Sequence, residues 1–350
     1  MSADAGPDVR AAVASGSRPC PEFLRLERRH GVTLLDWSAL GRSQGGRSAS
    51  RSVAHVARAL PQIRGVDAVF SDGEHLGIPL AAAMSARRIE VPHLSIGHHL
   101  VTPAKAASFR LLNARRRTDR ILVHAANQVG PVTRALRVPE SLVRVLPYGI
   151  DTDFWSAPAG MPQEADDRRG DLVVAAGREH RDYESLALAC AGQPVRVVVS
   201  GGSAHSPRAR RLEPSRWPAN IERRSCLPTE LRGLYRQASV VVVPLVACNF
   251  PAGITVVLEA MSMAKAVVVS ATEGLSGVID DGRTGVVVPP GDPSRLRAAI
   301  DELIHDPQRR RRIGLAARAA AVESHGLDAY VDGLAGHLAE LAARRPERRA

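Results

Sequence analysis

One segment, residues 240–292, constrains the fold of this chain more than any other. It alternates runs of valine, glycine-containing turns and one short apolar stretch: VVVVPLVACNFPAGITVVLEAMSMAKAVVVSATEGLSGVIDDGRTGVVVPPGD. The valine run at its start is typical of a parallel strand that is buried on both faces. Residues 248–253 then leave the carboxyl end of that strand as a loop, and α/β proteins bind their ligands at this edge of the sheet. The segment therefore predicts an α/β domain of parallel strands with a binding site after this strand.

A helix is expected over residues 255–264, directly after this loop. Its apolar residues recur at helical spacing, at Val256, Val257, Ala260, Met261 and Ala264. The free amides at the start of such a helix favour an anion. Glu259 lies slightly more than one turn further on, where its carboxylate can accept two hydrogen bonds from a vicinal diol such as a ribose. The alternative is an ordinary solvated glutamate on a surface helix.

These residues resemble a known signature. PAGITVVLEAM, followed by KAVVVS and DDGRTGVVVPPGD, is similar to the donor-site motif of the GT-B glycosyltransferases, in particular the large retaining family called GT4. The resemblance implies that Glu259 holds the nucleotide ribose and that the backbone amides of Gly253, Ile254 and Thr255 hold the diphosphate. Pro251 stands where the family has a first glutamate that contacts the donor sugar, so the resemblance leaves the donor sugar open.

A second candidate anion site follows the strand expected at residues 171–176. The sequence GREHRDYESL there places a glycine turn and two arginines before a helix, where guanidinium groups can neutralise a diphosphate. Cations are slightly unfavourable at a helix N-terminus, and this placement itself favours an anionic ligand. In the resemblance, Gly177 and Arg178 match the family's Gly-Arg pair, and Arg181 takes the place of a lysine. The alternative is a pair of exposed arginines at a helix end.

Two adjacent histidines, His98 and His99, follow the strand expected at residues 91–96. At the carboxyl end of that strand either ring would face the cleft between the domains, where it can hydrogen-bond a sugar hydroxyl or the leaving phosphate. The alternative is a histidine that only satisfies a backbone carbonyl. The predicted catalytic residues are His98, Arg178 and Arg181. The residues predicted to bind the nucleotide sugar are Gly177, Gly253, Ile254, Thr255 and Glu259.

The length of 350 residues exceeds what one hydrophobic core usually supports, so two domains of about 150 residues are expected. Residues 1–150 would form an acceptor-side, Rossmann-like domain with a shortened front, residues 151–326 the donor domain, and residues 327–350 a return helix and a basic tail. By the resemblance, these two parallel-sheet domains face each other across a cleft in a GT-B fold. Residues 1–20 are expected to be disordered or weakly ordered. The glycine-rich residues 41–48 are expected to form either an anion-binding loop or a flexible turn.

The pattern of apolar runs predicts the order of elements. In the first domain, strands are expected at residues 32–37, 66–71, 91–96, 120–124 and 143–147, with helices at residues 48–60, 75–86, 105–115 and 127–136. In the second, strands are expected at residues 171–176, 195–200, 220–223 and 240–245, with helices at residues 229–237, 255–264, 293–304 and 308–322. A final helix at residues 327–343 would cross back onto the first domain. Such alternation is typical of parallel βαβ units.

The charge balance favours anionic partners. The chain carries 47 basic and 36 acidic residues, a net charge of +11. Aromatic residues make up only 3% and are not interleaved with Arg or Lys, which argues against stacking-based recognition of single-stranded nucleic acid. An anionic lipid and a nucleotide diphosphate remain as candidate partners. Residues 105–117 hold five cations near Phe109, Leu111 and Leu112, and they are expected to form either an interfacial helix at an anionic membrane or an amphipathic helix packed on its own sheet.

Neither a metal nor a dedicated cofactor is expected. The four cysteines contain no Cys-x-x-Cys pair, which argues against a zinc site and a disulfide framework. Asp151 and Asp153 form an Asp-x-Asp pair, but their place after Gly149 favours capping of a turn over metal binding. The dinucleotide, P-loop and hydrolase signatures are missing too. Since neither a signal peptide nor a membrane-spanning run is found, we expect a cytoplasmic protein, with a peripheral position at the inner membrane face left open.

The resemblance implies a metal-independent, retaining, hexosyltransferase-like enzyme that uses a nucleotide-diphosphate sugar as its co-substrate. In such enzymes the leaving diphosphate helps to take the acceptor proton, so the protein acts mainly by electrostatics and positioning. The acceptor, which can be a glycan, a lipid or a small molecule, stays open. Two alternatives also stay open: a catalytically silent GT-B module that binds a nucleotide sugar or a partner, and a nucleotide-sugar epimerase of the same fold.

Overall fold

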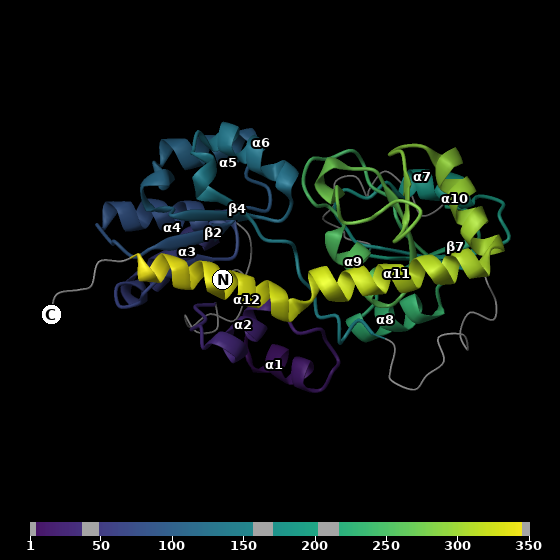
Figure 1. The fold of residues 1–350 in the computed structure, drawn as a ribbon, viewed down its shortest axis with the longest axis horizontal. Coiled ribbons are helices and arrows are strands. Elements are labelled where there is room, and N and C mark those ends of the chain that lie inside the picture. Colours follow the sequence, from purple (N-terminus) through teal and green to yellow (C-terminus); the bar gives the residue numbers. More distant parts are fainter. Residues whose placement is uncertain (1–4, 37–48, 157–170, 202–216, 345–350) are drawn as a thin grey trace. The chain divides into compact units, whose positions relative to one another are not determined.

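The structure is a computed structural model, and it describes residues 5–36, 49–156, 171–201 and 217–344. The chain forms two compact units, drawn in Figure 1. Unit 1 comprises Met1–Ser15, Cys20–Gly149 and Leu327–Ala350, and unit 2 comprises Gly16–Pro19 and Ile150–Gly326. The main chain therefore leaves unit 1 after Gly149 and returns to it at Leu327.

Unit 1 is built on a parallel sheet with the strand order β1-β2-β3-β4. The strands are β1 (Val69–Ser71), β2 (His93–Ile96), β3 (Arg120–Val123) and β4 (Val143–Val145). Neighbouring strands pair in parallel, with Leu94 of β2 opposite Arg120 of β3, for example. Because all four strands run in the same direction, the loops that follow them begin along one edge of the sheet.

Helices cover both faces of this sheet (Figure 1). One face packs against α4 (Glu74–Ala86), α5 (Pro103–Leu111), the 3-10 helix η1 (Ala114–Arg117) and α6 (Val129–Leu136). The other face packs against α1 (Pro7–Ala14), α2 (Glu22–His30) and α12 (Leu327–Ala343), and α3 (Ala49–Ile63) packs on α4. In β3, Ile121 joins the first core and Leu122 the second, since successive side chains of a strand point to opposite faces.

Ion pairs fix α12 to the rest of unit 1. Arg29 of α2 pairs with Asp332 of α12 at 2.6 Å. On the sheet, Arg120 is only 5% exposed and donates to Glu340 of α12 at 2.7 Å. Part of the arginine excess of this chain is therefore used inside the fold.

Unit 2 is built on a parallel sheet with the strand order β10-β9-β8-β5-β6-β7. The strands are β5 (Leu172–Ala176), β6 (Arg196–Ser200), β7 (Ile221–Arg224), β8 (Val240–Val243), β9 (Ala266–Ser270) and β10 (Val286–Val288). All residues of β5, β8 and β9 are buried, as their valine-rich sequences predict. The chain adds strands on one side of β5 and then on the other, so the strand order reverses between β5 and β8.

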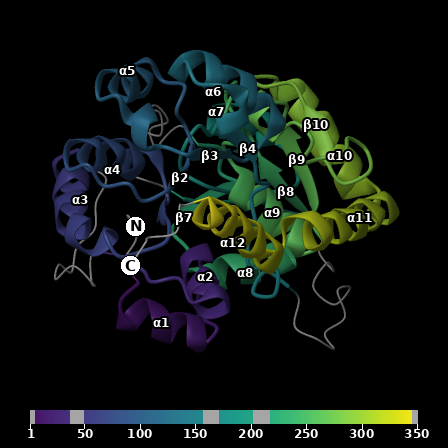
Figure 2. The ribbon, with the colours of Figure 1, turned by 60° about the vertical axis from the view of Figure 1, so that its left-hand side comes forward.

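Five helices of the described residues flank this second sheet, and Figures 1 and 2 show them in two layers. α7 (Tyr183–Cys190) and α10 (Pro293–His305) lie on one face and bury apolar side chains against β5, β6, β8 and β9. α8 (Pro228–Gln237), α9 (Ile254–Ser262) and α11 (Pro307–His325) lie on the other face. Aspartate side chains cap three of these helices, as at Asp182, whose carboxylate accepts from the Ser185 amide at 3.1 Å.

The two crossings of the chain meet at one point of unit 2. The Ile150 amide donates to the His325 carbonyl at 2.9 Å, and Ile150 forms a parallel bridge with Gly326. Asp151 follows, and its side chain accepts a hydrogen bond from the Phe154 amide at 3.1 Å. This contact is the turn capping that the sequence predicted for the Asp-x-Asp pair.

Two sequence predictions for the N-terminal region are wrong. The strand expected at residues 32–37 is absent from residues 32–36, although Val32 and Leu34 pack on the core of α2 and α12. The apolar character of this segment therefore indicates burial and not strand pairing. Residues 1–20 were expected to be weakly ordered, but Pro7–Ala14 forms α1, which Arg10 ties to Glu27 of α2 through a 2.9 Å hydrogen bond. Trp37 and the glycine-rich residues 41–48 lie outside the described residues.

Candidate functional site

The carboxyl ends of β5 and β8 form the centre of the candidate site in unit 2. The strand order reverses between these two strands, and open α/β sheets bind their ligands at such a switch point. The loops that follow both strands are joined directly. Arg181 forms an antiparallel bridge with Leu245, and the Asp182 amide donates to the Pro244 carbonyl at 3.0 Å. The two loops therefore present one continuous edge to a ligand.

The side chain of Arg181 lies between two glycines of these loops. Gly177 follows β5 with a φ of +105°, and Gly253 precedes α9 with a φ of +82°, a region that favours glycine. A Cβ atom on Gly177 would overlap the guanidinium group, and one on Gly253 would lie 3.4 Å from its Nη1. The same guanidinium donates to the Ala176 and Glu179 carbonyls, at 2.8 Å each. The two glycines thus make room for a fixed cation at the switch point.

Burial changes the acid strength of Arg181 without removing its charge. Desolvation lowers the pKa of its guanidinium below the ordinary value, while the nearby Tyr183, Tyr235 and Glu259 side chains act to raise it. An arginine stays protonated in proteins at neutral pH. The site therefore holds a partly dehydrated positive charge that an anionic ligand can neutralise.

Glu259 lies on α9, one helical turn after Thr255, and is partly buried. Its Oε2 accepts a hydrogen bond from the buried Tyr235 hydroxyl of α8 at 3.1 Å. Burial raises the pKa of the Glu259 carboxyl to about 8, although the Tyr235 hydrogen bond and the Arg181 charge act to lower it. The structure thus brings Glu259, Arg181, Gly177 and Gly253 to one place, from segments far apart in the sequence.

The start of α9 supplies the predicted amides. The first amides of a helix have no partner inside the helix, and Gly253, Ile254 and Thr255 occupy this position. The Ile254 amide already donates to the Pro251 carbonyl at 3.3 Å. Gly253 and Thr255 are therefore the better candidates for donating to an anion.

Arg178 behaves differently from Arg181. It is exposed, and the described residues provide no hydrogen bond or ion pair that would hold its side chain toward Glu259. Gly201, at the end of β6, packs against the turn after β5, since a Cβ there would lie 2.5 Å from the Gly177 carbonyl oxygen. Gly202 lies outside the described residues. Of the two predicted arginines, the structure fixes only Arg181.

In unit 1 the predicted residue His98 follows β2 and is exposed. Its Nε2 donates to the Asp72 carbonyl at 3.0 Å, and its amide donates to Glu74 Oε2 at 3.0 Å. In the neutral form of the ring, Nε2 then carries the hydrogen, so that Nδ1 has a lone pair that can accept a hydrogen bond from a hydroxyl. Glu74 is in turn held by Lys105 of α5, at 2.5 Å. The Asp72 carbonyl thus orients the ring, and the buried Glu74 carboxylate holds the main chain of His98.

Several residues around His98 were not predicted from the sequence. His124, directly after β3, is buried, and its ring centroid lies 5.3 Å from that of His98 and 5.0 Å from that of Tyr148. Its Nδ1 donates to the Leu146 carbonyl at 3.1 Å, while its Nε2 meets no hydrogen-bond partner among the described residues. Burial lowers the pKa of His124 to about 4, so the ring is neutral. Glu74 and Tyr148 follow predicted strands and His124 is the last residue of one, and this position at a strand end was the signal that could have found them.

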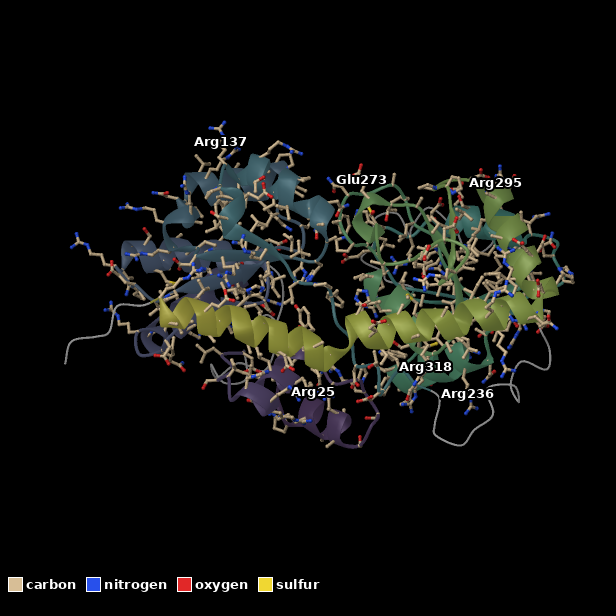
Figure 3. All side chains as sticks on the ribbon, viewed as in Figure 1. Arg25, Arg137, Arg236, Glu273, Arg295 and Arg318 are labelled. Carbon is tan, nitrogen blue, oxygen red and sulfur yellow. The ribbon has the colours of Figure 1, made fainter. Side chains whose placement is uncertain are left out.

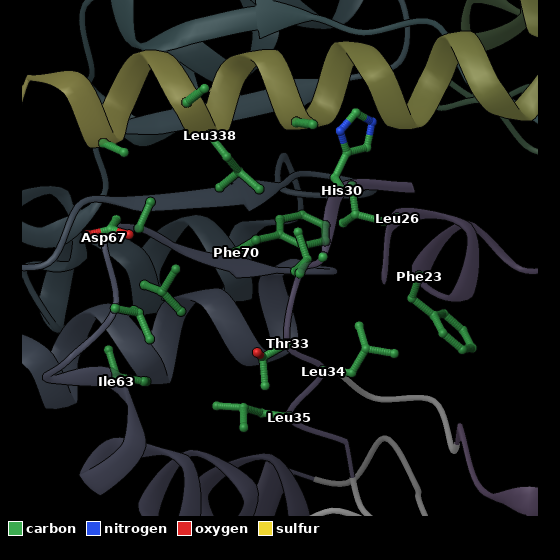
Figure 4. Close-up of a pocket in the computed structure, with 18 of the residues that line it drawn as sticks. Phe23, Leu26, His30, Thr33, Leu34, Leu35, Ile63, Asp67, Phe70 and Leu338 are labelled. Atoms are coloured by element: carbon green, nitrogen blue, oxygen red, sulfur yellow. The ribbon is translucent and has the colours of Figure 1, made fainter. Parts of the chain in front are cut away.

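Unit 1 also contains a cavity of ≈ 620 Å³ beside the edge strand β1 (Figure 4). Figure 4 shows Phe23, Leu34, Ile63, Phe70 and Leu338 among the side chains that line it. The lining is mainly apolar and contains none of the predicted site residues. An apolar lining does not suit a charged diphosphate, so this cavity is separate from the candidate site.

The part of the chain that the structure describes offers no metal site of the usual composition. It contains no group of three or more His, Cys, Asp or Glu side chains placed to hold a metal ion. Within the same ranges, no helix has the length and apolar character that a membrane crossing requires.

The comparisons with known proteins fit this geometry. The family model "Glycosyl transferases group 1" matches residues 183–306, which include Glu259 and Gly253. The solved structure of Anabaena Alr3699/HepE in complex with UDP-glucose superposes with a TM-score of 0.71 and 17% identity, over 97% of each chain. This chain is a GT-B protein related to the group 1 glycosyltransferases. The sequence predictions of the fold and of the family are thereby confirmed.

Other relatives of this GT-B protein are transferases or synthases of sugars. It is 29% identical over 280 residues to alpha-maltose-1-phosphate synthase of Mycolicibacterium smegmatis, covering 70% of this chain and 72% of that protein. It is 24% identical over 280 residues to alpha-D-kanosaminyltransferase of Streptomyces kanamyceticus, covering 76% and 72%. Sucrose-phosphate synthase of Thermosynechococcus elongatus superposes with a TM-score of 0.69 and 19% identity, over 85% of this chain and 80% of that one. The matched segment of the family model begins after Gly177, Arg178 and Arg181 and does not include these three residues.

Proposed function

We propose that the protein is a glycosyltransferase that moves a sugar from a nucleotide-diphosphate donor to an acceptor hydroxyl, with retention at the anomeric carbon. The observation that carries the proposal is the position of Arg181 beside Gly253, at the start of the helix that carries Glu259 and at the switch point of unit 2. A cation and a carboxyl group at this place match the two ends of a nucleoside diphosphate, the pyrophosphate and the ribose diol. The names of the relatives, and the UDP-glucose bound in the Anabaena structure, support the same donor class.

In this proposal the protein acts by charge and position. The bond between the anomeric carbon and the diphosphate oxygen breaks, and the acceptor oxygen bonds to the same face of that carbon. The acceptor proton passes to the departing diphosphate oxygen. Arg181 and the amides of Gly253 and Thr255 stabilise the negative charge on the diphosphate, so the reaction requires neither a protein nucleophile nor a metal. His98 accepts a hydrogen bond from a hydroxyl through Nδ1, since its Nε2 is engaged by the Asp72 carbonyl.

A catalytically silent module is the second candidate, and Pro251 favours it. In this chain Pro251 occupies the position of the glutamate that, by the resemblance, contacts the donor sugar. Its carbonyl accepts the Ile254 amide at 3.3 Å, so the residue shapes the loop and offers no side-chain group to a sugar. Slow hydrolysis of the donor separates the two candidates, because only an enzyme releases nucleoside diphosphate without an acceptor.

The test is a thermal-shift screen of the full chain against the diphosphates of uridine, guanosine and adenosine. Wild type is expected to be stabilised by at least one of them, while Arg181→Met and Glu259→Ala remove the shift. Arg178→Ala is expected to weaken it less, because that side chain is exposed. Arg196→Ala is the matched control, an exposed arginine at the opposite end of β6. Absence of any shift with all three nucleotides at millimolar concentration would end both candidate functions.

A further inference from the structure

Two adjacent leucines protrude from unit 1 at the end of α5. Leu111 is 85% exposed and Leu112 is 49% exposed. Leu111 is the most exposed large apolar side chain of the described residues. Single exposed leucines are common on protein surfaces, but a neighbouring pair at a helix end forms a small apolar tip.

The residues around this pair hold it in a fixed position. Phe109, on the turn before, is only 3% exposed, and Ala114, just after, is 0% exposed. Between them Asn113 adopts a left-handed φ of +49°, which ends the helix, and the Thr118 hydroxyl donates to the Ala114 carbonyl at 3.0 Å. The buried residues on both sides show that the leucines are held outward by the fold. Phe109 belongs to the core, so of the three apolar residues singled out in the sequence only the leucines are available to a partner.

Unpaired cations surround the tip. Arg110, Arg115 and Arg116 are exposed, and none of them forms an ion pair with a described residue. The neighbouring Lys105 and Arg117 are by contrast already paired, with Glu74 and Glu90. In addition, the sequence has no aspartate or glutamate between residues 90 and 119. The tip therefore combines two exposed leucines with three exposed arginines, Arg110, Arg115 and Arg116, that are their near neighbours in the chain.

The tip lies away from the candidate site residues of unit 1. α5 connects β2 to β3, which are parallel, so it runs from the carboxyl edge of the sheet to the amino edge. Lys105, near its start, contacts Glu74 at the His98 site, whereas Leu111 is its last residue. α6 connects β3 to β4 in the same sense and ends beside Arg137, which Figure 3 shows projecting outward. The amino edge of this sheet thus gains a further cation.

We propose that residues 110–116 form a docking tip for an anionic lipid bilayer. The arginines bind the phosphate groups of the lipid headgroups, and the two leucines enter the boundary between headgroups and acyl chains. A bilayer fits better than nucleic acid, because leucine offers no stacking surface to a base. The association is peripheral and reversible, since two side chains bury little area. This surface goes beyond the proposed function and does not depend on it.

The experiment is flotation of the full chain with vesicles of phosphatidylcholine, with and without phosphatidylglycerol. Wild type is expected to float only with the anionic vesicles, and less at high salt. The double variants Leu111→Ser with Leu112→Ser and Arg115→Glu with Arg116→Glu are each expected to lower the partition coefficient about tenfold. The matched controls lie in unit 2: Leu188→Ser, which replaces a leucine 58% exposed, and Arg311→Glu with Arg312→Glu on α11.

The outcomes separate clearly. Equal flotation of the tip variants and wild type, or no flotation of wild type, overturns the proposal. Binding of an oligonucleotide without binding of vesicles also overturns the proposal, because the arginines of the tip would then serve to bind nucleic acid. Each variant is checked by its melting temperature and its thermal shift with nucleoside diphosphate. A tip variant that loses vesicle binding but keeps the nucleotide shift supports the docking tip, whereas failure of the nucleotide shift in every protein would count only against the proposed function.

Discussion

The hydroxyl of Tyr235 donates a hydrogen bond to Oε2 of Glu259 at 3.1 Å. The two residues come from different helices, α8 and α9, and Tyr235 is completely buried. This contact holds the carboxyl group in one orientation before any ligand arrives, and ligand binding gains from such preorganisation. The orientation of the Glu259 carboxyl group therefore depends on a residue that need not touch the ligand.

Replacing Tyr235 by Phe should affect both stability and binding. The variant loses one buried hydrogen bond, and its free energy of unfolding is expected to fall by about 1–2 kcal/mol. Because that hydrogen bond lowers the pKa of Glu259, the pKa of the carboxyl group should rise further. Chemical denaturation measures the first effect, and nucleotide binding at several pH values measures the second. Binding identical to wild type across the pH range would show that Tyr235 does not prepare Glu259.

Glu259 should make the stability of the protein depend on pH. Its pKa is about 8 in the fold against 4.5 as the ordinary value, so between these limits the folded chain binds more protons than the unfolded chain. Stability attributable to this group therefore falls as the pH rises from 4.5 to 8. Glu259→Gln should be more stable than wild type at pH 8, by on the order of 1–3 kcal/mol for a partly exposed group, and nearly equal at pH 4.5. A constant difference between the two proteins from pH 5 to 8, measured by denaturation, would contradict the raised pKa.

Substitution of Gly253 tests the space beside Arg181. An alanine there must keep a φ of +82°, and its Cβ would lie 3.0 Å from Val243. Gly291→Ala is the control, since Gly291 has a φ of +71° and nothing within 4 Å of its Cβ position. Both variants should lose about 1–2 kcal/mol to backbone strain. Gly253→Ala should lose more than the control and should also lose nucleotide binding, as denaturation and titration calorimetry can measure.

Unit 1 should be sensitive to acid. Burial is the main cause that lowers the pKa values of His55, His93 and His124 to about 4, from 6.5. The unfolded chain therefore binds more protons than the folded chain between pH 6.5 and 4, and stability falls as the pH drops through this window. The loss by pH 4 should be several kcal/mol in unit 1, because each of these histidines removes at most roughly 1.4 kcal/mol as the pH falls by one. Hydrogen exchange, corrected for its intrinsic pH dependence, should show β2 and β3 losing protection before β8.

Much of the fold could be predicted from the sequence, because buried segments are recognisable by their apolar residues. The valine run of β8 and the Asp-Pro start of α10 identify their elements without any tertiary information. α2 was missed although the sequence contains its signals. Phe23 and Leu26 have helical spacing, and a glycine, Gly31, follows the end of the helix, where the structure shows it in the left-handed conformation. The segment at residues 32–36 shows the opposite error, because Val32 and Leu34 are packed on the core without pairing with a strand, and an apolar run indicates burial in either case.

The candidate site was predictable only in part. The sequence motifs predicted Gly253 and Arg181, which lie in loops after strands, and Glu259, which lies one turn further along the helix after Gly253. The contact of Glu259 with Tyr235 depends on how α8 lies beside α9, and local patterns do not determine that. The difference between Arg178 and Arg181 depends likewise on the bridge to Leu245, which joins two loops far apart in the sequence.

The hydrogen bond from Ile150 to His325 brings the beginning and the end of unit 2 together. Topologically, this unit is an insertion into a discontinuous unit 1, joined to it through neighbouring junctions at Gly149 and Leu327. The segment from residue 150 to residue 326 can therefore be exchanged as a cassette. A chimaera that carries the corresponding segment of a relative would exchange the proposed donor site while leaving the docking tip, His98 and His124 of the host unchanged.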